Sequence, residues 1–167
     1  MDNLHFYVVL IAGLVPLIIG FVWYNPKVFG TVWMNQTGIT PEMGKSSNMT
    51  KIFVLTYLFS CLLAFGMVPI VIHQFGFSSM MMGVPGIEDH TTGIGKTFND
   101  IMTNYGTNFR TFKHGALHGT ITGVVIALPI IAINALFEMK KAKYILIHFG
   151  YWTLTLALMG GVMCAFL

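Results

Sequence analysis

The sequence contains few charged residues, which make up only 9% of its 167 residues, whereas 55% are hydrophobic. A soluble globular domain carries roughly 25% charged residues. So few charges cannot cover a water-facing surface, and we therefore expect the chain to lie in a lipid bilayer, in keeping with its mean hydropathy of +0.73. The net charge of +3 is too weak to indicate a nucleic-acid-binding surface, so we expect no nucleic-acid partner.

Cysteine is also scarce, and no familiar catalytic motif is present. Cys61 and Cys164 both lie within apolar segments, so we expect free, buried thiols and no disulfide framework. The chain opens with Asp2 and no basic region, so we expect the first apolar segment to be a retained helix and not a signal peptide. No Cys-x-x-Cys, His-Glu-x-x-His or paired-carboxylate motif supports an enzyme, and we predict a protein that is not one.

Four apolar segments are long enough to cross a membrane as helices, which takes about 20 mainly apolar residues each. We predict spans over residues 5–24, 50–74, 112–137 and 143–166. Apart from lysines at their edges these segments contain no charged residue, as expected where a charge in the bilayer is costly. The predicted fold is all-α, an integral membrane bundle of four transmembrane helices that forms a single domain over residues 1–167.

The stretch Gly20–Met34 ends the first apolar segment and begins a short new helix. Asn25 can cap that helix, and Pro26 suits its first position because the first backbone N–H groups of a helix have no partner. The surrounding rings favour the boundary between hydrocarbon and water. The residues assigned to this membrane interface are Trp23, Tyr24, Pro26, Phe29 and Trp33. We predict a short interfacial helix at about Pro26–Met34.

The distribution of basic residues predicts the orientation. The first and third connections hold Lys27, Lys45, Lys51, Lys140, Lys141 and Lys143, against Lys96, Arg110 and Lys113 in the second. Since cytoplasmic loops are richer in basic residues, we expect loops 25–49 and 138–143 in the cytoplasm. The termini and the long loop 75–110 then face outward. Within that loop we interpret Gly93–Thr97 as a glycine-rich turn, because His90 stands where a phosphate-binding loop needs glycine.

A row of small residues marks one face of the third span. Gly115, Gly119 and Gly123 are spaced by four and so share that face. Small residues let another helix approach closely in a membrane. The spacing predicts helix packing, and it is consistent both with packing inside one bundle and with contact to a second subunit.

Histidines beside this row form a candidate metal site. His114 and His118 stand at i and i+4, a spacing at which two imidazoles can share a metal ion. The topology brings His73 to the same outer side, with His90 or His5 as further candidates, and methionine thioethers nearby would suit Cu(I). These thioethers belong to Met67 and Met80–Met82. The alternative is that the histidines only bond to backbone or water.

Prolines interrupt three of the spans, at Pro16, Pro69 and Pro129. Each frees a backbone carbonyl, and such breaks can line the substrate site of a transporter or can be tolerated kinks.

Three motifs resemble a known family. They are Trp23-Tyr24-x-Pro26-x-x-Phe29-Gly30-x-x-Trp33-Met34, Phe112-x-His114-Gly115-x-x-His118-Gly119 and Met159-Gly160-Gly161. The family is the domain of unknown function 1761 family of small bacterial integral membrane proteins. The resemblance implies a four-helix integral membrane protein and no particular activity, and we expect the protein in the bacterial inner membrane.

The leading functional hypothesis is a non-catalytic accessory or scaffold subunit that packs against a larger membrane complex or against another copy of itself, without a cofactor. One alternative is a protein that binds copper, zinc or haem through His73, His114 and His118, and another is a small transporter.

Overall fold

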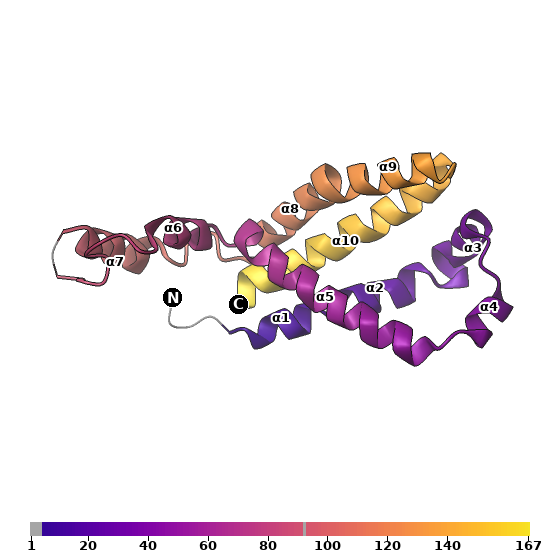
Figure 1. Cartoon of the computed structure of the whole chain (residues 1–167), viewed down its shortest axis with the longest axis horizontal. Coiled ribbons are helices and arrows are strands. Elements are labelled where there is room, and N and C mark those ends of the chain that lie inside the picture. Colours follow the sequence, from indigo (N-terminus) through magenta and orange to yellow (C-terminus); the bar gives the residue numbers. More distant parts are fainter. Residues whose placement is uncertain (1–4, 92) are drawn as a thin grey trace.

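The computed structural model describes residues 5–91 and 93–167, and the regular secondary structure of this part of the chain is entirely helical (Figure 1). Three helices are long and apolar enough to cross a membrane. They are α5 (Met49–Val71), the continuous helix Phe112–Phe137 and α10 (Ala142–Phe166). The bent pair Tyr7–Trp23 and Pro26–Thr37 is a fourth candidate if it counts as one span. The predicted all-α class is confirmed, with three to four candidate spans.

The first apolar segment forms two short helices, α1 (Tyr7–Ala12) and α2 (Val15–Trp23). Gly13 lies at the break between them, and a Cβ there would press on Cys61 of α5. The Tyr57 hydroxyl donates a hydrogen bond to the Leu10 carbonyl at 3.2 Å. The broken helix is therefore held along the side of α5.

The elbow after α2 has the predicted helix start. The Asn25 side chain accepts a hydrogen bond from the Lys27 amide at 2.9 Å, and the chain continues as the π-helical turn η1 (Pro26–Gly30) and α3 (Thr31–Thr37). A Cβ at Gly30 would overlap the Tyr24 carbonyl oxygen, so this close turn requires glycine. The helix runs three residues beyond its predicted end at residue 34. A further short helix, α4 (Pro41–Ser46), leads to α5.

The aromatic residues of the elbow also pack against α10. The Trp23 indole donates to the Ile147 carbonyl at 3.2 Å, and the Tyr24 hydroxyl lies 3.2 Å from His148 Nδ1. The Trp23 ring packs against Phe29 and the Tyr24 ring against Trp33. These rings attach the elbow to the first turns of α10.

The third span consists of α8 (Phe112–Thr122), the π-helical turn η2 (Gly123–Ala127) and α9 (Leu128–Phe137), and it runs antiparallel to α10 (Figure 1). The three glycines of its small-residue face lie against α10 of the same chain. A Cβ at Gly115 would overlap the Gly160 carbonyl oxygen, and one at Gly119 would overlap that of Leu156. The structure therefore shows the intramolecular alternative for this face.

The hydrophobic core lies where α1, α5 and α10 meet, near the end of the bundle at which α8 begins. Its most buried members are Ala12, Ala64, Met67, Val71, Met159, Met163 and Cys164. Cys164 is buried and Cys61 partly buried, and both are free thiols.

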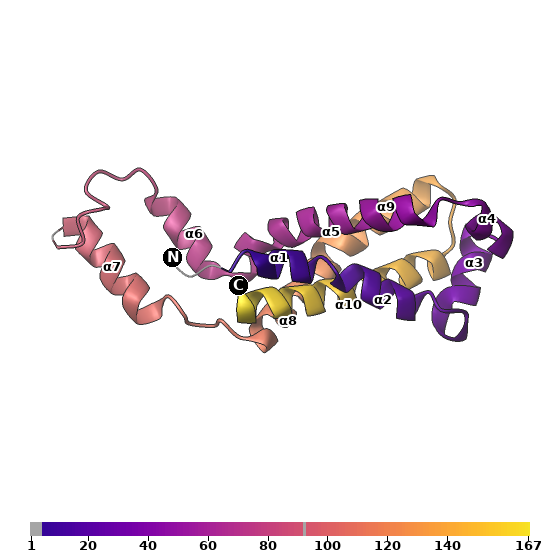
Figure 2. The same cartoon turned by 90° about the horizontal axis from the view of Figure 1, so that it is seen from below.

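The predicted long loop 75–110 is mostly helical, so that prediction is wrong. It contains most of α6 (His73–Met81) and all of α7 (Gly93–Tyr105), which form a hairpin projecting beyond the bundle (Figure 2). Residues Gly93–Thr97 are the first turns of α7 and not a glycine-rich turn. The sequence pattern that indicates the helix α7 is the spacing of four apolar residues, which places their side chains on one helical face. These residues are Ile94, Phe98, Ile101 and Tyr105. Phe98 stacks on Phe77 of α6 across the hairpin.

The predicted span 50–74 also ends early. Ile72 adopts an extended backbone conformation after Val71, so α5 stops there and His73 begins α6 in a new direction.

Candidate metal site

Three histidines meet where the hairpin joins the bundle. His73 is the first residue of α6, and His114 and His118 lie one turn apart on α8. Their ligand nitrogens all lie within 4.8 Å of one another, and His73 Nε2 is 2.9 Å from His114 Nε2. His73 is exposed, whereas His114 and His118 are partly buried. The structure thus brings together the three histidines that the sequence nominated as metal ligands.

The spacing of these nitrogens is close to that of a metal site. Tetrahedral Zn²⁺ with bonds of about 2.0–2.1 Å to nitrogen places its ligand atoms about 3.3 Å apart. The His73 and His114 nitrogens, 2.9 Å apart, are slightly nearer than this because the two rings share a hydrogen bond, in which one N–H donates to the other ring. A metal ion would take the place of that proton. The three ligand nitrogens, all within 4.8 Å of one another, would have to draw closer to reach this spacing around one ion.

Hydrogen bonds hold His73 in position. Its neighbour Gln74 donates from Nε2 to the Tyr105 carbonyl at 3.3 Å and to the Asn108 carbonyl at 2.8 Å. These bonds tie the start of α6 to the segment that follows α7. The extended Ile72 is fully buried, so the backbone just before His73 is anchored in the core.

The start of α8 positions His114. The Thr111 side chain caps the helix by accepting a hydrogen bond from the His114 amide at 3.3 Å. The Phe109 ring stacks on the His114 ring at 5.1 Å between centroids, and Phe109 adopts a left-handed backbone with φ of 63°. The His114 ring is therefore held by its own helix cap and by this aromatic neighbour.

Cys164 of α10 connects both sides of the cluster. Its Sγ lies 3.3 Å from the Val71 carbonyl and 3.3 Å from the Phe109 carbonyl, so the single S–H of one buried thiol is shared between the two segments that lead to the histidines. Arg110 in turn donates from Nε to the Cys164 carbonyl at 3.1 Å. The apolar surroundings of Cys164 in the sequence predict a buried thiol, but no local pattern indicates that it links two distant segments.

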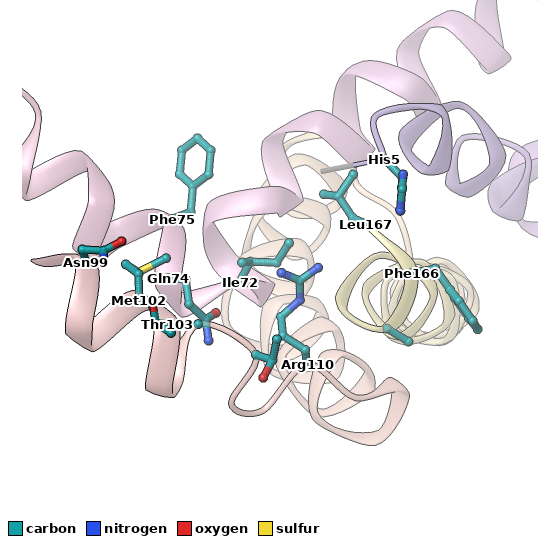
Figure 3. Close-up of a pocket in the computed structure, with 13 residues that line it drawn as sticks. His5, Ile72, Gln74, Phe75, Asn99, Met102, Thr103, Arg110, Phe166 and Leu167 are labelled. Atoms are coloured by element: carbon teal, nitrogen blue, oxygen red, sulfur yellow. The ribbon is translucent and has the colours of Figure 1, made fainter. Parts of the chain in front are cut away.

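Two hollows flank this junction. One, of about 400 Å³, lies between α6 and the end of α7, and His73 and Phe109 form part of its wall. The other, of about 660 Å³, lies between the hairpin and the end of the bundle. Figure 3 shows the Arg110 side chain extending into this second hollow beside Ile72. Gln74 and Met102 line both hollows and so separate them.

The other candidate ligands lie elsewhere. His5 lines the larger hollow and donates its amide to the Leu167 carbonyl, and His90 is exposed in the connection between α6 and α7. Met67 is buried in the core, whereas Met80 and Met82, near the far end of α6, are 78% and 82% exposed. Met80 is about 10 Å along the helix axis from His73. Of the histidines named from the sequence, only His73, His114 and His118 come together in the described residues.

The fold and the apolar helices define an all-helical protein compatible with several passes through a membrane. Residues 7–164 match the family model described as "Protein of unknown function (DUF1761)", so the chain belongs to that family. The resemblance drawn from the elbow and the histidine motif is thereby confirmed. No curated protein and no solved structure matches the chain.

Proposed function

We propose that this protein binds a transition-metal ion, Zn²⁺ in the first place, at the edge of the membrane. The observation that carries the proposal is the convergence of His73, His114 and His118, whose ligand nitrogens lie within 4.8 Å of one another. The cluster joins two elements far apart in the sequence, so a bound ion would fasten the projecting hairpin to the bundle.

The chemistry of the cluster favours a bare ion of the zinc or Cu²⁺ type. Imidazole nitrogen suits zinc, copper, iron and nickel, whereas Cu(I) prefers thiolate and thioether sulfur. The exposed Met80 and Met82 lie away from His73 along α6, which weakens the argument for Cu(I). Haem iron takes one or two axial ligands from a protein. Three converging imidazoles fit an ion better than haem.

We further propose that the cluster faces outward from a bacterial inner membrane. The support is the excess of lysines in loops 25–49 and 138–143, which favours a cytoplasmic location for the opposite end of the bundle. In this orientation the ion would come from outside the cytoplasm.

Metal analysis of the purified protein tests the proposal. After removal of metal with a chelator and addition of Zn²⁺, we expect one ion per chain by elemental analysis, and none in a His114→Ala, His118→Ala double variant. His90→Ala is the matched control, because His90 is exposed and outside the cluster, and it should retain the ion. A parent protein that takes up no metal, or a double variant that takes up as much as the parent, would contradict the proposal.

A second candidate function is that of an accessory or scaffold subunit. The observation in its favour is the α6–α7 hairpin, which projects past the end of the bundle (Figures 1 and 2) and presents exposed side chains such as Met80, Met82 and Tyr105. A larger membrane protein or a second copy of the chain would cover this surface.

Native mass spectrometry after extraction in mild detergent tests this second candidate. A mass that includes another polypeptide or a second chain supports it, and replacing Met80 and Met82 with Ser should then reduce the complex. A protein that remains one chain under these conditions counts against it.

A further inference from the structure

We propose that the metal ion at the three-histidine site keeps one coordination position for an exchangeable ligand, an apolar carboxylate that enters from the hollow beside His73. This inference rests on the proposed metal-binding function and adds to it the class of ligand.

The number of ligands is the first step. Structural zinc sites use four protein ligands, whereas sites that exchange water or substrate use three and leave the fourth position open. The cluster offers three histidines, and no Cys, Asp or Glu among the described residues joins them. His5 and His90, which the sequence suggested as further ligands, are outside the group. An ion bound here is therefore one protein ligand short.

The location of the smaller hollow is the second step. His73, a proposed ligand, forms part of its wall. Phe109, which stacks on the second ligand His114, forms another part. The hollow thus borders the cluster directly at His73 and reaches His114 only through the Phe109 ring, so a molecule inside it can approach an ion on its His73 side.

The lining of the hollow is the third step. Phe77, Ile101, Met102 and Tyr105 give it apolar walls, and none of its lining residues is Lys, Arg, Asp or Glu. A volume of about 400 Å³ suits a small molecule. The positive charge that would attract an anion here is that of the metal ion itself. A ligand with a carboxylate for the metal and an apolar body for these walls satisfies both parts of the site.

Loading the site with Co²⁺ in place of Zn²⁺ allows ligand binding to be detected, because the visible absorption spectrum of Co²⁺ changes with the ligands that it binds. We would load the purified protein with Co²⁺ and titrate it with acetate and, separately, with phenylacetate. Both carboxylates should change the spectrum, and phenylacetate should act at a concentration at least tenfold lower, because its ring removes apolar surface from water.

A matched pair of variants on α7 tests the role of the hollow. Ile101 lines it, whereas Ile94 is on the same helix and outside it. Ile101→Ala removes three carbons from this wall, and the lost contact of the ligand with one of them is already equivalent to about fourfold, so phenylacetate binding should weaken by at least about fourfold while acetate binding is unchanged. Ile94→Ala should change neither. The titrations are repeated with the histidine double variant to subtract any effect of detergent.

The outcomes separate the two proposals. A protein that gives no Co²⁺ spectrum, where the double variant also gives none, overturns the metal-binding function. A clear Co²⁺ spectrum that neither carboxylate changes overturns the exchangeable position and leaves the metal-binding function in place. Equal affinity for acetate and phenylacetate overturns the assignment of the hollow as the ligand's location.

Discussion

Cys164 shows how one residue can link segments that the chain places far apart. Its thiol lies between the carbonyls of Val71 and Phe109, and these residues precede His73 and His114 respectively. A buried carbonyl that is left without a hydrogen-bond donor lowers the stability of the folded protein. Removing the thiol should therefore loosen both segments that position the histidines, although Cys164 is not itself a proposed ligand.

Replacement of Cys164 tests this positioning role. Cys164→Ala removes the donor, and we expect the affinity for Zn²⁺ to fall roughly tenfold, a typical effect of losing a residue that supports a metal ligand. Cys164→Ser keeps a donor of similar size and should restore most of the affinity. Competition with a chromophoric chelator measures both. Equal affinities of the parent and the Ala variant would show that the packing around Cys164 holds the histidines without its hydrogen bonds.

The contact between α8 and α10 depends on glycine at several positions. At Gly119 the backbone of the facing helix is so close that a Cβ would overlap the Leu156 carbonyl oxygen, and Gly115 and Gly160 face each other in the same way. Membrane helices gain van der Waals contact by such close approach, because lipid supplies no hydrophobic force between them. The packing of α8 on α10 also positions His114 and His118 relative to Cys164.

Gly119→Ala is expected to destabilise the fold of a single chain. The added methyl group would push α8 away from α10, at a cost of about 1–3 kcal/mol, and lower the midpoint of thermal unfolding in detergent. Gly66→Ala on α5 is the matched control, because a Cβ there meets nothing within 4 Å. A Gly119→Ala protein as stable as the Gly66→Ala protein would contradict this prediction and show that the close contact of α8 with α10 contributes little to stability.

The whole molecule has two distinct ends. The hairpin and the histidine cluster lie at one end, and the elbow helices η1, α3 and α4 lie at the other (Figure 2). The connection between α9 and α10 is at the elbow end and contains Lys140 and Lys141. If the positive-inside preference sets the orientation, these lysines remain in the cytoplasm while the hairpin is outside.

Labelling of introduced cysteines in intact cells tests the orientation. Met82 and Met139 are 82% and 88% exposed and lie at opposite ends of the molecule. A membrane-impermeant maleimide should label Met82→Cys and not Met139→Cys, with the parent protein as the control for Cys61 and Cys164. Labelling of Met139→Cys alone would reverse the assigned orientation and place the histidine cluster in the cytoplasm.

Some features were predictable from the sequence because they depend on neighbouring residues alone. The apolar segments, the cap at Asn25 and the i, i+4 pair His114 and His118 all follow from local composition and helical spacing. The same reasoning failed for α6 and α7, because the many glycines of this segment concealed an amphipathic pattern that becomes a stable helix only when Phe98 packs on Phe77.

The sequence by itself determined an all-α chain with apolar helices, the position of the elbow and which side chains share a face of α8. Helical periodicity and the cost of charge in lipid are properties of each segment alone. Only the tertiary structure decided that the glycine face meets α10 of the same chain, and that His73, and neither His5 nor His90, reaches the α8 pair. The first choice depends on close backbone contacts between α8 and α10, and the second on the extended Ile72 that begins α6 in a new direction; the Cys164 thiol contacts the segments before His73 and His114, and no local pattern encodes these contacts between distant segments.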